Sequence, residues 1–408
     1  MARLSAQQRV NLTVLVAALG YFVDVFDLQL FSMVRVNSLA SLGLSGSDVT
    51  STGILLQNWQ MAGLLLGGIL WGIYGDKKGR LSILFGTILL YSLGNIANAF
   101  VTTVPAYAAA RFISGLGLAG EIGAGVTLAS ELLPKTTRGY GTALIFCCGG
   151  MGPLAAGFVA YASDWRTSYI IGGILGLGLL ILRVSVRESG MFSEIQKQAH
   201  ISRGHFLMLF NNRKRLLRYL MCIGCGIPAW ILLGVITVFA PEIGRALNIS
   251  EPLKASTAVM AYFAGFMFGA LLIGLLSQIF KNRKIVMLAF IVGLAITCAI
   301  LLMSKEISAQ IFYGLIGIGG FFCGYWNLFA TTTAEQFGTN LRTTAATTVP
   351  NFARGSIIID TFLLSLFKPS LGFLGGVSAV TILGFMVAFL ALWRLPETFG
   401  RDLDFVER

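Results

Sequence analysis

Six ionisable side chains lie within long apolar stretches of this 408-residue chain, where water is scarce. They are Asp24, Asp27, Arg111, Glu121, Arg354 and Asp360. A charge in an apolar medium is costly unless it is paired or faces a wet cavity, so such residues are commonly functional. Carboxylates at these positions can bind protons, and guanidinium groups can bind anions. The six positions therefore predict where the chemistry of the protein takes place.

Asp27 and Arg111 are expected at a similar depth in the apolar layer. Asp27 precedes Arg35 by eight residues, about 12 Å along a helix, and Arg111 follows Pro105 by six residues, about 9 Å. A carboxylate and a guanidinium at one depth can neutralise each other. Proton capture by Asp27 would release Arg111 and let the helices shift, which is a two-state switch. A static buried salt bridge is the alternative.

Asp24 and Glu121 complete the group of candidate proton-coupling residues. Asp24 is one helical turn before Asp27, so both side chains can face the same cavity. Asp24 could share the proton, meet a cationic group of a ligand, or simply face water. Glu121 lies ten residues after Arg111, about 15 Å further along the helix. It could face the cavity or form a hydrogen bond with a neighbouring helix.

Arg354 is the candidate for binding an anionic substrate. It lies in the middle of an apolar stretch and requires an anion there. The anion could be a substrate carboxylate or Asp360, six residues later on the same helix. Trp230 and Tyr262 are further candidates for the cavity wall, with core packing favoured for each. Other side chains expected to contribute to the substrate site are Glu121, Gln57, Asn58, Gln60, Tyr325, Trp326 and Asn327.

The apolar stretches themselves predict an all-α membrane protein. Apolar residues make up 56% of the chain and charged residues only 12%, whereas soluble proteins carry about twice that charge. Twelve stretches are each long enough to cross a bilayer as a helix. They cover about 10–35, 51–74, 82–101, 105–133, 139–163, 167–186, 217–240, 254–280, 285–303, 308–334, 343–367 and 372–394. The first carries two aspartates and no small-residue cleavage site, so it is not expected to be a signal peptide.

The distribution of charge predicts the orientation in the membrane. The net charge of +12 does not indicate nucleic-acid binding, because most of the 30 Lys and Arg residues fall in the loops on one side. This positive-inside pattern places both termini in the cytoplasm. The expected location is the inner membrane of a bacterium. The Lys and Arg residues expected at the outer side are Arg35, Arg166, Arg245, Lys254, Lys305 and Lys368.

The chain is also a tandem repeat. Glu131 and Arg138 recur as Glu335 and Arg342 at an offset of 204 residues, half of the chain. We therefore expect two pseudo-symmetric six-helix bundles, at 1–190 and 216–408, joined by a cytoplasmic linker at 191–215. Repeats of this kind commonly enclose a binding site near the middle of the bilayer.

Charged residues at the cytoplasmic helix ends are expected to form a gate. Ion pairs between the halves would close the inner mouth and would break when it opens. Isolated surface pairs contribute less than about 1 kcal/mol each, so a network is needed. The candidate gate residues are Asp76, Arg80, Glu131, Arg138, Glu335 and Arg342.

The motifs resemble those of the major facilitator superfamily. The loop from Gly72 to Arg80 is similar to the signature loop between its second and third helices. The segment Arg111–Glu121 and the ending Pro396-Glu397-Thr398 resemble its metabolite:proton symporter, sugar porter and aromatic-acid symporter branches. The resemblance implies the twelve-helix fold of that family, alternating access, and Asp27 as the proton carrier.

Other classes of protein are not indicated. The sequence has no Gly-x-x-x-x-Gly-Lys-Ser/Thr loop, so ATP-driven transport is not expected. No set of catalytic residues or metal ligands indicates an enzyme or a metal site, and Cys222-x-x-Cys225 is expected to be structural. The proton is the expected coupling ion, with no cofactor, and the protein is expected to be a monomer.

The expected function is proton-coupled uptake of a small polar, carboxylate-bearing metabolite. The same switch would also serve a proton-driven exporter of a drug, siderophore or metabolite. A membrane sensor or receptor that does not transport is a further alternative from another class.

Overall fold

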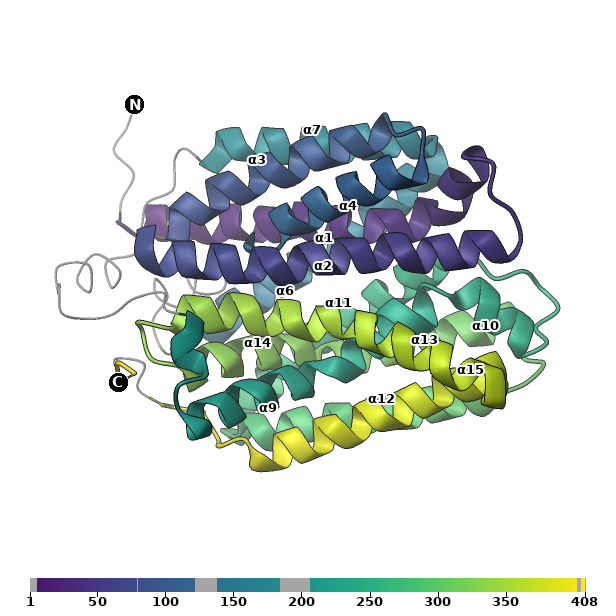
Figure 1. Ribbon diagram of the computed structural model, residues 1–408. Coiled ribbons are helices and arrows are strands. Elements are labelled where there is room, and N and C mark those ends of the chain that lie inside the picture. Colours follow the sequence, from purple (N-terminus) through teal and green to yellow (C-terminus); the bar gives the residue numbers. More distant parts are fainter. Residues whose placement is uncertain (1–5, 79, 122–137, 184–205, 402–404, 408) are drawn as a thin grey trace.

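The computed structural model describes residues 6–78, 80–121, 138–183, 206–401 and 405–407. All regular secondary structure in these ranges is helical (Figure 1). The first half contains α1 (Ala6–Ser41), α2 (Ser47–Lys78), α3 (Arg80–Ala99), α4 (Val104–Leu118), α6 (Arg138–Ala162) and α7 (Trp165–Arg183). The second half contains the 3-10 helix η1 (Phe206–Leu209), α9 (Arg213–Trp230), the π-helix η2 (Ile231–Thr237), α10 (Ala240–Ala246), α11 (Ala255–Phe280), α12 (Arg283–Met303), α13 (Ala309–Cys323), α14 (Tyr325–Gln336) and α15 (Arg342–Arg394).

The predicted all-α membrane fold is confirmed. Within the described residues, nine continuous helical segments are long and apolar enough to cross a bilayer. The last of them, α15, holds two spans, because Gly372 interrupts it with a φ of 73° that favours glycine. The helices α3 and α4 correspond to the third span and to the start of the fourth. Each of the twelve predicted spans therefore has a helical counterpart.

The two halves of the chain lie side by side. In Figure 1, α1, α2, α3, α4 and α7 form the upper layer, and most of the second-half helices form the lower layer. The halves meet mainly where α2 packs along α15 and α6 packs along α11. The start of α1 and the C-terminal residues lie at the same end of the bundle. We call this end, which the charge pattern predicts to be cytoplasmic, the inner end.

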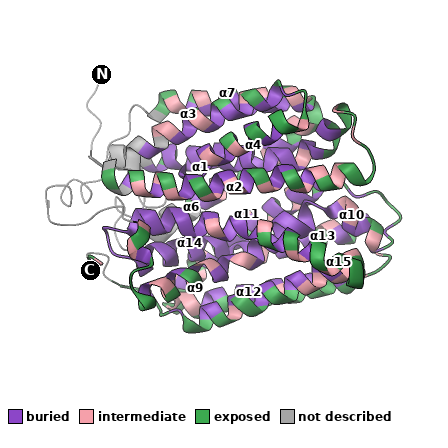
Figure 2. Cartoon of the chain, viewed as in Figure 1, coloured by how far each residue is buried: buried purple, intermediate pink, exposed green. Residues whose placement is uncertain are grey.

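Burial follows the pattern expected for a protein surrounded by lipid. Figure 2 shows mainly buried residues on α1 and α14, whereas the outer faces of α7 and α12 are exposed. Large apolar side chains lie on these outward faces, including Ile181 of α7 (75% exposed) and Met303 of α12 (81%). In water such a surface would favour aggregation, whereas acyl chains solvate it.

Glycines allow α2 and α4 to approach closely, and this contact positions the site. A Cβ on Gly115 of α4 would collide with the carbonyl oxygen of Gln60, and one on Gly63 of α2 would collide with that of Phe112. Small residues of this kind let membrane helices pack backbone to backbone. The approach brings the side chain of Gln60 next to Arg111.

Candidate functional site

Asp27 is fully buried within the first half of the chain. It projects from α1 toward α7, since a Cβ on Gly172 would collide with its Oδ1. Asp24, Arg111 and Asn95 lie within electrostatic range of its carboxyl group. Neither carboxylate oxygen has a hydrogen-bond partner among the described residues. Asp27 is therefore a buried acid that no described residue holds by a hydrogen bond.

Arg111 is held by an amide and an aromatic ring. Its Nη2 donates a hydrogen bond to Oε1 of Gln60, and its guanidinium lies 4.4 Å from the centre of the Phe31 ring. Arg111 is also fully buried, with Nε and Nη1 lacking hydrogen-bond partners in the described part of the chain. The static salt bridge with Asp27, one of the sequence-based alternatives, is absent from this conformation.

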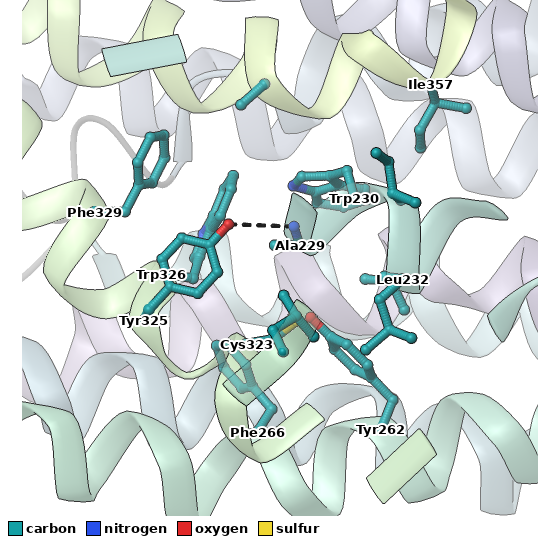
Figure 3. Close-up of a cluster of buried hydrophobic side chains, with 14 of the residues drawn as sticks. Ala229, Trp230, Leu232, Tyr262, Phe266, Cys323, Tyr325, Trp326, Phe329 and Ile357 are labelled. Carbon is teal, nitrogen blue, oxygen red and sulfur yellow. Dashed lines mark hydrogen bonds between the residues drawn. The ribbon is translucent and has the colours of Figure 1, made fainter. Parts of the chain in front are cut away.

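A small cavity lies between the two halves, close to these residues. The helices α1, α9, η2, α11, α14 and α15 all contribute to it. Half of its lining residues are aromatic, and Figure 3 shows the rings of Trp230, Trp326, Tyr262 and Phe266 converging on one region. The remaining lining residues are Tyr21, Val25, Leu28, Gln29, Ala229, Leu233, Phe263 and Arg354.

Arg354 supplies the positive charge of this cavity. Its side chain is 1% exposed, and its guanidinium lies 5.5 Å from the centre of the Trp230 ring. Its Nε and Nη1 have no hydrogen-bond partner among the described residues. Arg354 and Asp24 are both within electrostatic range of Tyr21, which belongs to the opposite half from Arg354. The cavity thus presents unsatisfied guanidinium donors beside flat apolar surfaces.

A second small cavity adjoins the first. The two share Leu28, Gln29, Trp230 and Leu233 as walls. Its polar lining comes from Gln29, Ser32, Gln57 and Gln60, and Gln57 donates a hydrogen bond of 3.1 Å to the carbonyl oxygen of Gly234. Because Gln60 also binds Arg111, one side chain connects the buried acid–base region to the cavity.

The model of the Major Facilitator Superfamily matches residues 17–349. The chain belongs to the Major Facilitator Superfamily. Its fold is similar to that of the proton:xylose symporter XylE bound to 6-bromo-6-deoxy-D-glucose, with a TM-score of 0.74 over 98% of both chains at 18% identity.

Curated superfamily members with similar sequences are named as transporters. The niacin transporter NiaP of Acinetobacter baylyi is 30% identical over 181 residues, which is 43% of this chain and 40% of that protein. The chain therefore spans less than half of that relative's length in the match. A probable 4-methylmuconolactone transporter of Cupriavidus pinatubonensis is 23% identical over 94% of this chain and 90% of its own length.

Four of the residues predicted to bind substrate line the two cavities of this superfamily member: Arg354, Gln57, Gln60 and Trp326. Three others stabilise contacts between helices, outside these cavities. Asn58 forms a hydrogen bond of 3.3 Å with Thr361, and Asn327 donates one of 3.0 Å to the carbonyl oxygen of Ala270. The hydroxyl of Tyr325 accepts from the backbone N–H of Ala229 at 3.2 Å and donates to the carbonyl oxygen of Cys225 at 2.9 Å.

The two remaining acidic candidates also lie outside the cavities. Glu121 accepts a hydrogen bond of 3.1 Å from Thr87 of α3, which corresponds to the helix-packing alternative. Asp360 accepts one of 3.1 Å from Ser356 on its own helix. It makes no ion pair with Arg354, so the intraprotein alternative for Arg354 does not apply to this structure. Buried polar groups with protein partners require no ligand.

Sequence reasoning missed several cavity residues. Trp230 and Tyr262 were weighed as cavity-wall residues, with core packing favoured, and both roles apply, because each belongs to the core and lines the aromatic cavity. Gln29 and Tyr21 were not considered, although both lie on the same helix as Asp24. A signal was available for Tyr21, which lies three residues before Asp24, because residues three or four positions apart share one face of a helix.

At the inner end, the side chains of the predicted gate residues Asp76, Arg80, Glu131 and Arg138 lie outside the described residues. Glu335 forms an ion pair of 2.7 Å with Arg283 in the second half. Arg342 is fully buried at the start of α15.

Direct packing between the halves closes this end. Thr344 of α15 donates a hydrogen bond of 3.4 Å to the carbonyl oxygen of Gly72, and Asn351 donates one of 2.6 Å to that of Ala119. The contacts therefore run from α15 to both α2 and the end of α4.

The segment Pro396-Glu397-Thr398 near the C-terminus is held by residues of the second half. Glu397 accepts hydrogen bonds from the backbone N–H groups of Arg283 and Lys284, at 3.1 and 2.9 Å. Burial raises the pKa of Glu397, but the N–H donors of Lys284, Phe399, Arg283 and Thr398 lower it further, so the pKa lies below its ordinary value. At a pH above the ordinary carboxyl pKa, this contact therefore stabilises the fold. The stabilisation is lost as the pH falls through the lowered pKa of Glu397.

The outer end carries an inter-half ion pair that the sequence did not reveal. Arg35 of α1 is fully buried and forms an ion pair of 3.1 Å with Glu242 of α10. Thr50 of α2 donates a hydrogen bond of 2.9 Å to the same carboxylate. Both ends of the interface are thus closed by contacts between the halves, and the two cavities lie between them.

Replacing Glu242 by Gln is expected to favour opening of the outer end. Removing one partner of a buried ion pair leaves the other charge uncompensated, at a cost of about 3–5 kcal/mol in the closed state. Spin labels on Ser47→Cys and Lys368→Cys, in a background lacking Cys147 and Cys148, should report a longer distance distribution. Glu251→Gln, which neutralises an exposed carboxylate, is the control. Identical distributions for Glu242→Gln and the parent protein would show that the ion pair does not hold the outer end closed.

Proposed function

We propose that this chain is a proton-coupled symporter that takes up small carboxylates with a flat apolar body. The observation that carries the proposal is the Arg354 guanidinium in an aromatic-lined cavity at the contact between the halves. A guanidinium binds a carboxylate through two parallel charge-assisted hydrogen bonds. Rings such as Trp230 and Trp326 provide apolar contact for a planar body. Niacin, a pyridine carboxylate named for one relative, has both features.

In the proposed mechanism, Asp27 carries the proton. With Asp27 neutral, Arg111 remains bound to Gln60, as in the present conformation. Loss of the proton leaves a negative charge on Asp27, within electrostatic range of Arg111. This charge attracts the guanidinium and draws it away from Gln60. Because Gln60 lines the second cavity, its release changes the cavity wall. Proton binding is thereby linked to the shape of the substrate site.

The wider arrangement in this proposal is that of an alternating-access transporter. Two units, at 1–190 and 216–408 and joined by the segment 191–215, move relative to each other about the cavity. The protein acts as a monomer in a bacterial inner membrane, with both termini in the cytoplasm. The contacts at the outer and inner ends break alternately.

Uptake into proteoliposomes tests this function. Nicotinate, benzoate and an aliphatic carboxylate should be compared with the matching amides under an inward proton gradient, with and without a protonophore. Symport predicts gradient-dependent accumulation of a carboxylate but not of its amide. Depletion from preloaded vesicles would instead indicate the exporter, and binding without movement would indicate a sensor. Equal uptake of acid and amide would contradict the role of Arg354.

A further inference from the structure

A groove at the inner end of the bundle contains a cluster of cations that the proposed transport cycle does not use. It lies between the start of α9 and the end of α15 and is open to the surroundings. It is lined by Lys214, Leu217, Arg218, Met221, Arg394, Leu395 and Pro396. Three cations therefore lie beside an apolar floor on helices that face lipid.

The charges of this groove are only partly balanced. Arg218 binds Glu407 at 2.7 Å and the carbonyl oxygen of Gln336 at 2.7 Å. Lys214 and Arg394 are exposed, and neither makes an ion pair with a carboxylate in the described part of the chain. Glu407 is engaged by α9 arginines, so no carboxylate among the described residues pairs with the two exposed cations on the rim of the groove.

The apolar part of the groove indicates that its occupant is a lipid. Leu217 is 43% exposed beside the cations, and Trp393, next to Arg394, is 70% exposed. Exposed tryptophans commonly lie at the level of lipid headgroups. A cationic rim at this level, with an exposed leucine directly below it, matches a phosphate headgroup and its acyl chains. A free phosphate ion would gain nothing from the apolar floor.

We propose that this groove binds the headgroup of an anionic phospholipid from the leaflet at the inner end. Lys214 and Arg394 contact the phosphate, and the acyl chains lie along Leu217 and Met221. Basic pockets between membrane helices on the cytoplasmic side are suited to such headgroups. The lipid would connect α9 to α15, two helices that also pack directly through Gly224 and Ala391.

Native mass spectrometry of the full-length protein tests this proposal. The probe is phosphatidylglycerol, compared with phosphatidylcholine, added to protein in a mild detergent. The double variant Lys214→Gln/Arg394→Gln should lower the bound fraction of phosphatidylglycerol on the order of 10-fold. The control Lys254→Gln/Lys305→Gln removes the same charge from exposed positions at the other end and should bind like the parent. The swap Lys214→Arg/Arg394→Lys should retain binding.

Two results would overturn the proposal. One is equal retention of phosphatidylglycerol by the Lys214→Gln/Arg394→Gln variant and its control. The other is displacement of the lipid by glycerol 3-phosphate at a similar concentration, which would identify a site for soluble phosphates. Thermal unfolding of each variant establishes that the fold is intact. Transport need not be measured, so the outcome is independent of the proposed uptake function.

Discussion

Replacing Asp27 by Asn is expected to abolish accumulation of substrate against its gradient while leaving exchange across the membrane intact. Asn resembles the neutral acid in shape and cannot release a proton, so the switch stays in one state. A pH difference of one unit across the membrane supplies about 1.36 kcal/mol for each proton that enters. Coupling to one proton therefore supports about a tenfold ratio of internal to external substrate concentration. In the variant the concentration ratio should fall to about one, because the pH gradient no longer drives uptake. Proteoliposome uptake and counterflow measure the two activities separately.

Asp48→Asn is the matched control for this experiment. Asp48 is an exposed acid near the outer start of α2, so the same chemical change there should leave accumulation unchanged. Tenfold accumulation by the Asp27 variant would remove Asp27 from the coupling mechanism. Loss of both accumulation and exchange would instead indicate damage to the fold or to the substrate site.

Replacing Arg354 by Gln is expected to weaken carboxylate binding by about 10- to 100-fold. Hydrogen bonds to a charged group contribute about 1.5–3 kcal/mol, and the variant retains only a neutral amide donor. Affinity for the matching amide ligand should change little, because the walls formed by Trp230 and Trp326 remain. Quenching of tryptophan fluorescence can report binding, because both tryptophans line the cavity.

Two further variants sharpen this prediction. Arg354→Lys keeps the charge but loses the planar pair of donors, so it should recover only part of the affinity. Arg245→Gln removes an exposed arginine at the outer end and should bind like the parent. Unchanged carboxylate affinity in Arg354→Gln would exclude Arg354 from the substrate site and leave the aromatic cavity without its proposed anion partner.

The membrane fold was predictable because lipid imposes a simple rule. Every spanning segment must be long, apolar and helical to satisfy its own backbone, so each one is visible in a linear sequence. The charges at Asp27, Arg111 and Arg354 were visible because they interrupt these apolar segments. The repeat was visible because Glu131 and Arg138 recur as Glu335 and Arg342 at one offset.

The neighbours of those charges were not predictable. Gln57, Asn58 and Gln60 are almost consecutive, yet Gln57 and Gln60 line a cavity and Asn58 binds Thr361. Successive helical residues turn by about 100°, so small differences in helix rotation decide which amide faces the cavity. Sequence shows that these side chains share a helix, but it does not show which neighbouring helix each one faces.

The sequence by itself determined the twelve spans, the repeated halves and the buried charges, because each depends on residues close together in the chain or on composition. Only the tertiary structure decided that Arg111 binds Gln60 instead of Asp27, that Arg354 faces an aromatic cavity, and that Arg35 meets Glu242 across the two halves. These contacts join helices that are distant in sequence. Their partners follow from how the helices pack and rotate against one another, and no local pattern of residues records that geometry.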